Sequence, residues 1–352
     1  MVQLLKVHGS QNAFFILDQT QLTNPLTDEE LVSFTQQITD AQNGVLGGAD
    51  GVLVVNHPTR PGSAAQMRVI NADGSEASMC GNGLRTVARY VAERDNLTDF
   101  KVDTMNASLR VRQHEDLAPG VPAFAVEISP VKFDRTALPF DNLGHERLLD
   151  TLVPELYPSL RFSALAVPNP HLISFVSMEE LNGSALEELG TRLNSDNPYF
   201  SDGVNVNFGH ILGHNKLFVK TFERGVGFTN ACGTGMSATS LALALTHPDA
   251  ASFNEPISVY NPGGMVKTIL HRDDYNYWVE LIGNATFTNI ITVEESTIHQ
   301  ENLDELQSSS VETDENTEYL AFVNSLPSLK FETSKNLKDN IDENSVSTQN
   351  IH

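Results

Sequence analysis

Met79-Cys80-Gly81-Asn82-Gly83-Leu84-Arg85-Thr86 and Ala231-Cys232-Gly233-Thr234-Gly235-Met236-Ser237-Ala238 are the two stretches that decide the fold. Both contain the pattern Cys-Gly-x-Gly, and together they hold the only two cysteines among 352 residues. A predicted helix follows each pattern. After the first cysteine, apolar residues recur at helical spacing; after the second, residues 236–245 carry no charge, which is typical of a helix buried on nearly all sides.

The position of each cysteine at the start of a helix indicates what its thiol can do. The first backbone N–H groups of a helix have no partner within it, and the peptide dipoles leave partial positive charge there. A thiolate is stabilised at such a place, and glycines let a ligand approach the N–H groups closely. We therefore expect two thiols, one from each half of the chain, to face each other across a bound anion.

Composition excludes several classes of partner. The chain carries 22 Lys and Arg against 45 Asp and Glu, a formal net charge of −23, which argues against binding to nucleic acid or to an anionic membrane. Neither a signal peptide nor an apolar run of the roughly 20 residues that span a bilayer is recognisable, so we expect a cytoplasmic protein. Two cysteines without close spacing predict neither a disulfide framework nor a metal site.

The order of predicted elements before each cysteine motif indicates a duplication. Two strand-like runs and then a helix with a capping box precede both motifs: Val2 to Val7, Ala13 to Asp18 and Leu26 to Asn43 in the first half, and Arg161 to Val167, His171 to Val176 and Glu179 to Asn194 in the second. This order predicts an α/β fold of two pseudo-symmetric domains, each with a mixed sheet wrapped around a central helix. The expected domains are residues 1–130 with Cys80 and residues 131–296 with Cys232, and the boundary lies near Ser129 to Asp141.

Residues 297–352 have a different composition. They contain 11 acidic residues, 3 lysines and no glycine, and Ser, Thr and Asn are abundant. Such a segment has little apolar surface to offset the entropy of ordering, so we expect an acidic, disordered tail. Its one apolar cluster, Glu318 to Phe331, is predicted to form a short amphipathic helix if it forms any structure.

Seven blocks, in this order along the chain, resemble the family of the diaminopimelate epimerases. They are His8-Gly9-Ser10-Gln11-Asn12, Asn71-Ala72-Asp73-Gly74-Ser75-Glu76, Met79 to Arg85, Pro168-Asn169-Pro170-His171, Asn205-Val206-Asn207-Phe208, Glu223-Arg224-Gly225 and Ala231 to Gly235. The resemblance covers about residues 1 to 292. It implies an isomerase without a cofactor, usually a homodimer, that interconverts LL- and meso-diaminopimelate for the synthesis of lysine and of peptidoglycan precursors.

The resemblance also implies a role for each matching residue. Cys80 and Cys232 match a thiolate and a thiol that remove and return the α-proton on opposite faces of the substrate. His171 and Glu223 match positions that assist catalysis by orienting the site and tuning thiol ionisation. Substrate binding is implied for Asn12, Asn71, Gly81, Asn82, Asn169, Asn205, Glu223, Arg224, Gly233 and Thr234.

Two positions depart from the family pattern. Ala13 stands where an Asp commonly follows the first Asn, which puts the local hydrogen bonding in doubt. Gly51 stands where many members have Gln, which removes a possible substrate contact.

Other interpretations compete with catalysis. The cysteines could be small buried apolar residues, Asn12, Asn71 and Asn169 could be turn residues, the Glu223–Arg224 pair could be a surface ion pair, and His171 could be a core histidine. Among whole-protein functions, the alternatives are a racemase of proline or hydroxyproline, a dithiol redox protein and a non-catalytic amino-acid-binding protein. The absence of Cys-x-x-Cys disfavours the redox protein.

Overall fold

The computed structural model describes residues 1–273 and 276–327 of the chain. The first half contains two short 3-10 turns, Gln19–Gln21 and Val45–Gly47, and the following strands and helices: β1 (Val2–Gly9), β2 (Asn12–Asp18), α1 (Asp28–Ile38), β3 (Gly51–Asn56), β4 (Ala65–Asn71), β5 (Glu76–Ala77), α2 (Gly81–Asp95), β6 (Asp99–Asp103), β7 (Ser108–His114) and β8 (Ala123–Ile128). The second half contains β9 (Thr151–Leu152), β10 (Arg161–Ala166), β11 (Pro170–Phe175), α3 (Met178–Asn182), α4 (Ala185–Leu193), β12 (Asn205–Gly213), β13 (Lys216–Glu223), β14 (Gly227–Thr229), α5 (Gly233–Thr246), β15 (Pro256–Asn261), β16 (Gly264–Arg272), β17 (Tyr277–Asn284) and β18 (Thr286–Val293).

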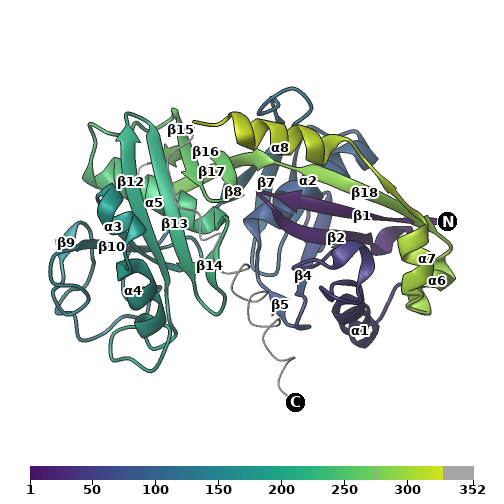
Figure 1. Ribbon diagram of the computed structural model, residues 1–352, viewed down its shortest axis with the longest axis horizontal. Helices are drawn as coiled ribbons and strands as arrows, with labels where there is room; N and C mark the ends of the chain where they lie inside the picture. Colours follow the sequence, from purple (N-terminus) through teal and green to yellow (C-terminus); the bar gives the residue numbers. More distant parts are fainter. Residues whose placement is uncertain (274–275, 328–352) are drawn as a thin grey trace, which may run out of the picture.

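Strand pairing is repeated in the two halves. In the first half β2 pairs with β3, and β4 with β6, in parallel, while β1–β2, β3–β4, β4–β5, β6–β7 and β7–β8 are antiparallel. In the second half β11–β12 and β13–β15 are parallel, while β10–β11, β12–β13, β13–β14, β15–β16 and β16–β17 are antiparallel. The predicted α/β fold of two pseudo-symmetric halves is thus confirmed, and Figure 1 shows the two halves side by side.

Two strands late in the sequence join the halves. β17 pairs with β8, so the sheet runs without interruption from one half to the other, and the next strand, β18, pairs with β1. A division at about residue 130 is therefore wrong for β18, which follows β17 in sequence but belongs to the sheet of the first half. Sequence order cannot indicate this, because the pairing partners lie more than 270 residues apart.

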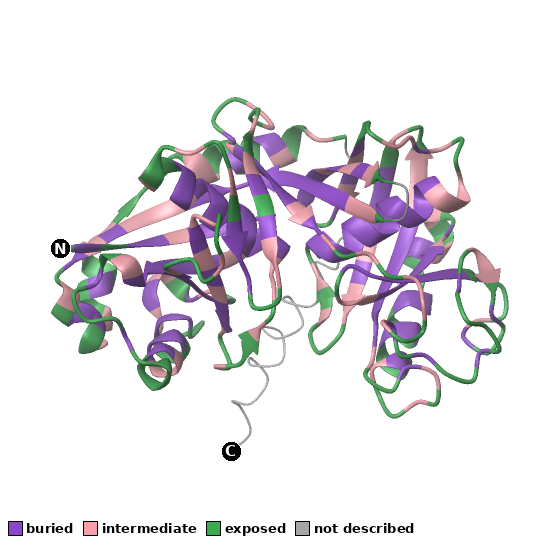
Figure 2. Cartoon of the chain, turned by 180° about the vertical axis from the view of Figure 1, so that it is seen from behind, coloured by how far each residue is buried: buried purple, intermediate pink, exposed green. Residues whose placement is uncertain are grey.

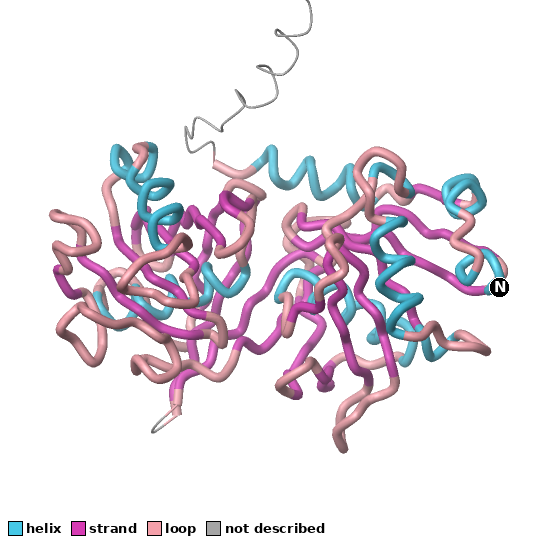
Figure 3. The backbone as a smooth tube through the Cα atoms, turned by 90° about the horizontal axis from the view of Figure 1, so that it is seen from below, coloured by secondary structure: helices cyan, strands magenta, loops and turns pink. Residues whose placement is uncertain are grey.

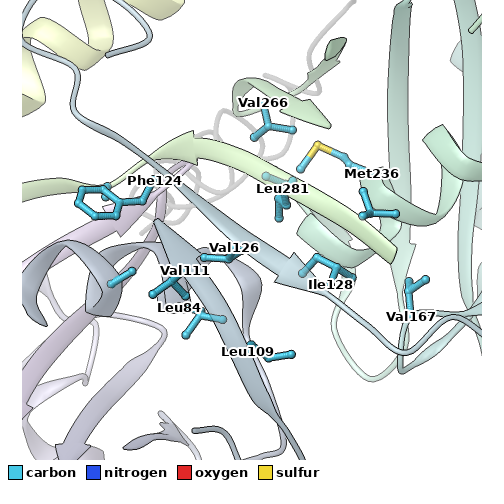
Figure 4. Close-up of a cluster of buried hydrophobic side chains, with 14 of the residues drawn as sticks. Leu84, Leu109, Val111, Phe124, Val126, Ile128, Val167, Met236, Val266 and Leu281 are labelled. Carbon is cyan, nitrogen blue, oxygen red and sulfur yellow. The ribbon is translucent and has the colours of Figure 1, made fainter. Parts of the chain in front are cut away.

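The two cysteine-bearing helices occupy the centres of the halves. α2 contacts β1, β7 and β8, whereas α5 contacts β11, β12 and β13, and both contact β17. Their buried side chains belong to one shared apolar cluster, in which Leu84 of α2 and Met236 of α5 flank the β8–β17 junction (Figure 4). Burying a side chain of this size contributes about 1.5–3 kcal/mol, so the junction is a substantial part of the core.

Burial of α5 on nearly all sides is confirmed: every residue from Gly233 to Ala244 is buried (Figure 2). Thr234, the first of its five hydroxyl residues, contacts Cys232 Sγ at 3.5 Å, and the other four do not remain unsatisfied in this apolar setting. Ser237, Thr239, Ser240 and Thr246 donate to carbonyl oxygens four residues earlier, at 2.7–2.9 Å. A helix of small apolar and hydroxyl residues can therefore fill the centre of a sheet without an exposed polar face.

Both capping boxes are present, at Thr27 with Glu30 and at Ser177 with Glu180. The single helix expected over 179–194 is wrong, because α3 ends at Asn182 and α4 begins at Ala185. Gly183, in extended conformation between them, ends the first helix.

The prediction of a disordered tail is wrong for residues up to 327. This segment forms α6 (Glu295–His299), α7 (Leu303–Ser308), β19 (Ser310–Glu312) and α8 (Glu315–Ser325), and β19 pairs with the outer edge of β18. The side chains of Ile298, Leu306 and Tyr319 are fully buried. Only a few apolar side chains of this acidic segment are buried. The average composition of the segment therefore does not indicate that it is ordered. The rest of the predicted tail, 328–352, lies outside the described residues.

No helix in 1–273 or 276–327 is long and apolar enough to cross a membrane.

Candidate active site

Each cysteine is the N-cap of its helix. The backbone N–H of Gly83 donates to Sγ of Cys80, and that of Gly235 donates to Sγ of Cys232, both at 3.4 Å. The predicted placement of two thiols at matched helix N-termini is thus observed. The first N–H groups of a helix have no partner within it, so these two helix starts are suited to a ligand with a negative charge.

The two helix starts meet directly across the boundary between the halves. Asn82 Nδ2 donates to the carbonyl oxygen of Ala231, the residue before Cys232, at 3.2 Å, and to Oδ1 of Asn12 at 3.3 Å. A Cβ atom on Gly233 would lie 2.8 Å from the end of the Leu281 side chain and 3.9 Å from the Cα of Gly81, so the two motifs lie close together here. Asn82 therefore links both cysteine motifs, and its buried Oδ1 has no hydrogen-bond partner among residues 1–273 and 276–327.

Burial makes both thiols hard to ionise in the absence of a ligand. It raises the pKa of Cys80 to about 11, against the opposing effects of the Gly83 N–H and the Arg85 guanidinium. Burial likewise raises the pKa of Cys232 to about 12, and the carboxylate of Glu223 raises it further. The Cys80 thiol donates to Asn12 Oδ1 at 3.7 Å. Both cysteines are free thiols in the structure.

His171 holds a substrate-binding candidate in place. Its ring is fully buried, and this burial lowers its pKa to about 3, so the imidazole is neutral. Asn207 Nδ2 donates to Nδ1 of the ring at 3.1 Å, and the Nε2–H donates to Oδ1 of Asn169 at 3.1 Å. The amide nitrogen of Asn169 is therefore the group that this arrangement leaves to face a ligand.

Glu223 and Arg224 lie at the end of β13, where the chain turns toward Cys232. Burial raises the pKa of the Glu223 carboxyl, while the nearby Thr229 and Cys232 side chains oppose this rise. Asn205 Oδ1 accepts from the backbone N–H of Arg224 at 2.8 Å, and the guanidinium itself is exposed. A carboxyl beside one thiol can exchange a proton with it, and the exposed guanidinium can bind a carboxylate.

Asn71 lies at the end of β4, where it pairs in register with Gly51, next to the turn that carries Asn12. Its Nδ2 donates to Ser75 Oγ at 3.0 Å within the β4–β5 turn. Gly51 has no room for a larger side chain, because a Cβ atom would lie 2.4 Å from the carbonyl oxygen of Ile70. The glycine at this departure from the family pattern therefore fits the local backbone.

Two residues of the site, Asp50 and Asn207, were not predicted from the sequence. Asp50 Oδ2 accepts from Asn12 Nδ2 at 2.6 Å and from the Ala13 N–H at 2.9 Å, and this directs Asn12 Oδ1 toward Cys80 and Asn82. The other residue is Asn207, which orients His171. Asn207 lies two residues after Asn205 in one strand, so both side chains point to the same face of the sheet. This spacing could have indicated that Asn207 also belongs to the site. Asp50 gave no local signal.

Among the described residues, no group of three or more His, Cys, Asp and Glu side chains could hold a metal ion.

Comparisons with known proteins agree on one family. Residues 4–125 and 163–288 match the family described as diaminopimelate epimerase. Proteins named diaminopimelate epimerase from Ligilactobacillus salivarius (strain UCC118) and from Enterococcus faecalis (strain ATCC 700802 / V583) are 52% and 54% identical to the chain. The first alignment covers 92% of this chain and 98% of the relative, and the second covers 82% and 88%. The first alignment therefore includes residues after 288, where the family match ends; this part of the chain is here called the C-terminal extension.

Solved structures with the same fold are more distant in sequence. A phenazine biosynthesis protein of the PhzF family from Bacillus anthracis has a TM-score of 0.57 at 14% identity, over 83% of this chain and 99% of that one. A probable proline racemase from Agrobacterium radiobacter K84 has a TM-score of 0.52 at 12% identity, over 85% and 96%.

Proposed function

The chain belongs to the diaminopimelate epimerase family, and on that premise we propose that it is an isomerase that interconverts LL- and meso-diaminopimelate at the α-carbon. The observation that carries the proposal is the meeting of two cysteine-capped helix N-termini, tied together by Asn82. Inversion at one carbon needs a base on one face and an acid on the other, and two thiols from opposite halves of the chain supply them.

In the proposed reaction, the α-proton of the substrate passes to the thiolate of one cysteine while the thiol of the other protonates the opposite face of the carbon. The free enzyme holds both thiols protonated, so one must first lose its proton. Burial and the Glu223 carboxylate hold the Cys232 thiol protonated, whereas Cys80, the thiol with the lower pKa, releases its proton to solvent. Cys80 then begins as the base and Cys232 as the acid, and turnover in the opposite direction starts with these roles exchanged.

Charge that develops on the substrate carboxylate is stabilised by the N–H groups of the two helix starts, Gly81–Asn82 and Gly233–Thr234. Asn12, Asn71, Asn169 and Arg224 hold the polar ends of the substrate. His171 and Asn205 act indirectly. His171 bonds to Asn169, and Asn205 accepts from the backbone N–H of Arg224. The family resemblance further supports a cytoplasmic homodimer that needs no cofactor; the oligomeric state is checked by light scattering on the purified protein.

Incubation with LL-diaminopimelate in deuterium oxide tests the function. We expect loss of the α-proton NMR signal together with appearance of the meso isomer, and no exchange with free proline. Exchange with proline alone would instead support the racemase. Disulfide reduction without α-exchange would indicate a redox protein, and binding of diaminopimelate without exchange would indicate a binding protein.

A further inference from the structure

Helix α8, here called the strap, lies across the junction of the two halves (Figures 1 and 3). Its aromatic residues Tyr319 and Phe322 form a buried cluster with Val121 from the first half and Met265 from the second. The strap follows residue 288, where the match to the family ends. It is thus an addition to the two-domain fold that contacts both domains at once.

The N-terminal end of the strap is fixed to the first half by a charged pair. Glu315 accepts two hydrogen bonds from the Arg89 guanidinium, at 2.5 and 2.7 Å, and a third from the Phe287 N–H at 2.8 Å. Arg89 lies on α2, the helix that begins after Cys80, and is only 8% exposed. The bidentate geometry fixes where the next turn of the strap can lie.

That next turn contacts the loop of Asn12 through His8. Asn316 Oδ1 lies 3.2 Å from His8 Nε2, and the Tyr319 ring packs edge to face on the imidazole at 4.7 Å. On the other side of the ring, Nδ1 accepts from the Gln11 N–H at 3.3 Å. Ser10 and Gln11 both have left-handed backbone, with φ of 54° and 65°, which is costly for residues with a side chain. The turn that presents Asn12 is therefore supported by a histidine that the strap contacts, together with Asn284, which bonds to both His8 and Ser10.

The same strap residue reaches the Cys232 loop from behind. The Tyr319 hydroxyl donates to the carbonyl oxygen of Gly263 at 2.7 Å. The N–H of Gly263 in turn donates to the carbonyl oxygen of Asn230 at 2.9 Å, two residues before Cys232. Gly264 must be glycine here, because a Cβ atom would lie 2.8 Å from the tyrosine hydroxyl. One side chain thus supports both the loop that orients Cys80 and the loop that carries Cys232.

We propose that the strap positions the two active-site loops relative to each other, with Tyr319 as the positioning residue that acts through His8 and Gly263. This inference rests on the proposed epimerase function. It assigns to the C-terminal extension a role in the proton-transfer geometry, which tolerates only small displacements: an error of about 1 Å in such a site can cost about 100-fold in rate.

The test uses the full chain with Tyr319→Phe, which keeps the ring on His8 and removes only the hydroxyl, and with Asn316→Ala, which removes the strap's hydrogen bond to the imidazole. Leu320→Ala, on an exposed part of the same helix, is the matched control. We expect each of the first two variants to lower kcat about 3- to 10-fold, as loss of one buried hydrogen bond allows, while KM changes less than 2-fold and the melting temperature stays near that of the parent. The control should match the parent in all three.

The outcomes separate this inference from the function on which it rests. Absence of α-proton exchange in the parent protein itself would refute the epimerase function. An active parent with unchanged kcat in both variants would overturn the strap's role alone. So would a loss of kcat that follows only a lower melting temperature and a smaller folded fraction, because a merely structural helix would behave in that way.

Discussion

Asp50 offers a sharp test of how the Cys80 side of the site is built. Its Oδ2 accepts from both the Asn12 side chain and the Ala13 N–H. An amide has a donor end and an acceptor end, and Asp50 fixes which end of Asn12 faces Cys80. Without that carboxylate, rotation of the amide would turn its nitrogen toward the Cys80 thiol and the Asn82 Nδ2, so that donors would face donors.

The expected size of the effect follows from the two hydrogen bonds. Bonds to a charged group contribute about 1.5–3 kcal/mol each when buried, but Asp50 is exposed, which reduces each to about 1 kcal/mol. A loss of about 2 kcal/mol corresponds to about 30-fold in rate. Asp50→Ala should therefore lower kcat/KM by 10- to 30-fold. Asp50→Asn can place its oxygen at the same point, keep both bonds and lose less than 5-fold.

The assay is the rate of α-proton exchange of LL-diaminopimelate in deuterium oxide, with melting temperature measured in parallel. Asp40→Ala is the matched control, since Asp40 also accepts two backbone hydrogen bonds in an exposed turn, from Gln42 and Asn43, but none from Asn12 or Ala13. Activity of Asp50→Ala within 2-fold of the parent would refute the proposed orientation of Asn12. Equal losses in the alanine and asparagine variants would show that charge at this position matters rather than the geometry of the bonds.

Four further predictions concern the thiols and the packing around them. Replacing Cys80 or Cys232 by alanine should each lower epimerisation at least 100-fold with little change in melting temperature, and full turnover by either variant would rule out a two-thiol reaction. Glu223→Gln should slow epimerisation but accelerate alkylation of the thiols by iodoacetamide at pH 8, because the negative charge that raises both thiol pKa values is gone; slower alkylation would contradict this. His171, with a pKa lowered from 6.5 to about 3, binds its proton more readily in the unfolded chain, so the free energy of unfolding should fall below pH 6.5, by about 1.4 kcal/mol at pH 5.5 from this group; urea titrations with a flat profile from pH 7 to 5.5 would be inconsistent. Glu315→Ala removes the bidentate partner of the buried Arg89, which keeps its bonds to Glu93 and to the Ala285 carbonyl oxygen, and should cost about 2 kcal/mol of stability, measured by urea unfolding; a loss below 1 kcal/mol would show that Glu93 alone satisfies the arginine.

Features that depend on nearby residues were predictable from the sequence. The two cysteine N-caps, both capping boxes and the full burial of α5 follow from spacing within about ten residues, and the structure confirms each. The repeated order of strands was also readable, since it is a comparison of the chain with itself. The identity of strand partners across the halves was not, because it depends on which distant strand edge is free: β18 returns to β1, and no residue in β18 indicates this.

The site was predictable to the same extent. Asn12, Asn82 and Cys80 were expected together, and they lie together. Hydrogen bonds between side chains far apart in the sequence could not be predicted. Examples are the bond between Asp50 and Asn12 and the bond between Asn316 of the strap and His8. The strap itself was missed because disorder was inferred from average composition, whereas a few buried contacts were enough to fix it.

The two Cys-Gly-x-Gly motifs are nearly identical but have different surroundings, and this affects how readily the epimerisation can run in both directions. Cys80 faces the neutral Asn12 and Cys232 lies beside the Glu223 carboxyl, yet burial brings the pKa of one to about 11 and of the other to about 12. Burial is the largest cause of the rise at both thiols, so the two forms of the enzyme, with one or the other cysteine as thiolate, carry a similar desolvation cost. Each turnover converts one form into the other. A larger difference would trap the enzyme after one direction of reaction, so closely matched thiols are what an enzyme needs to invert a carbon in both directions.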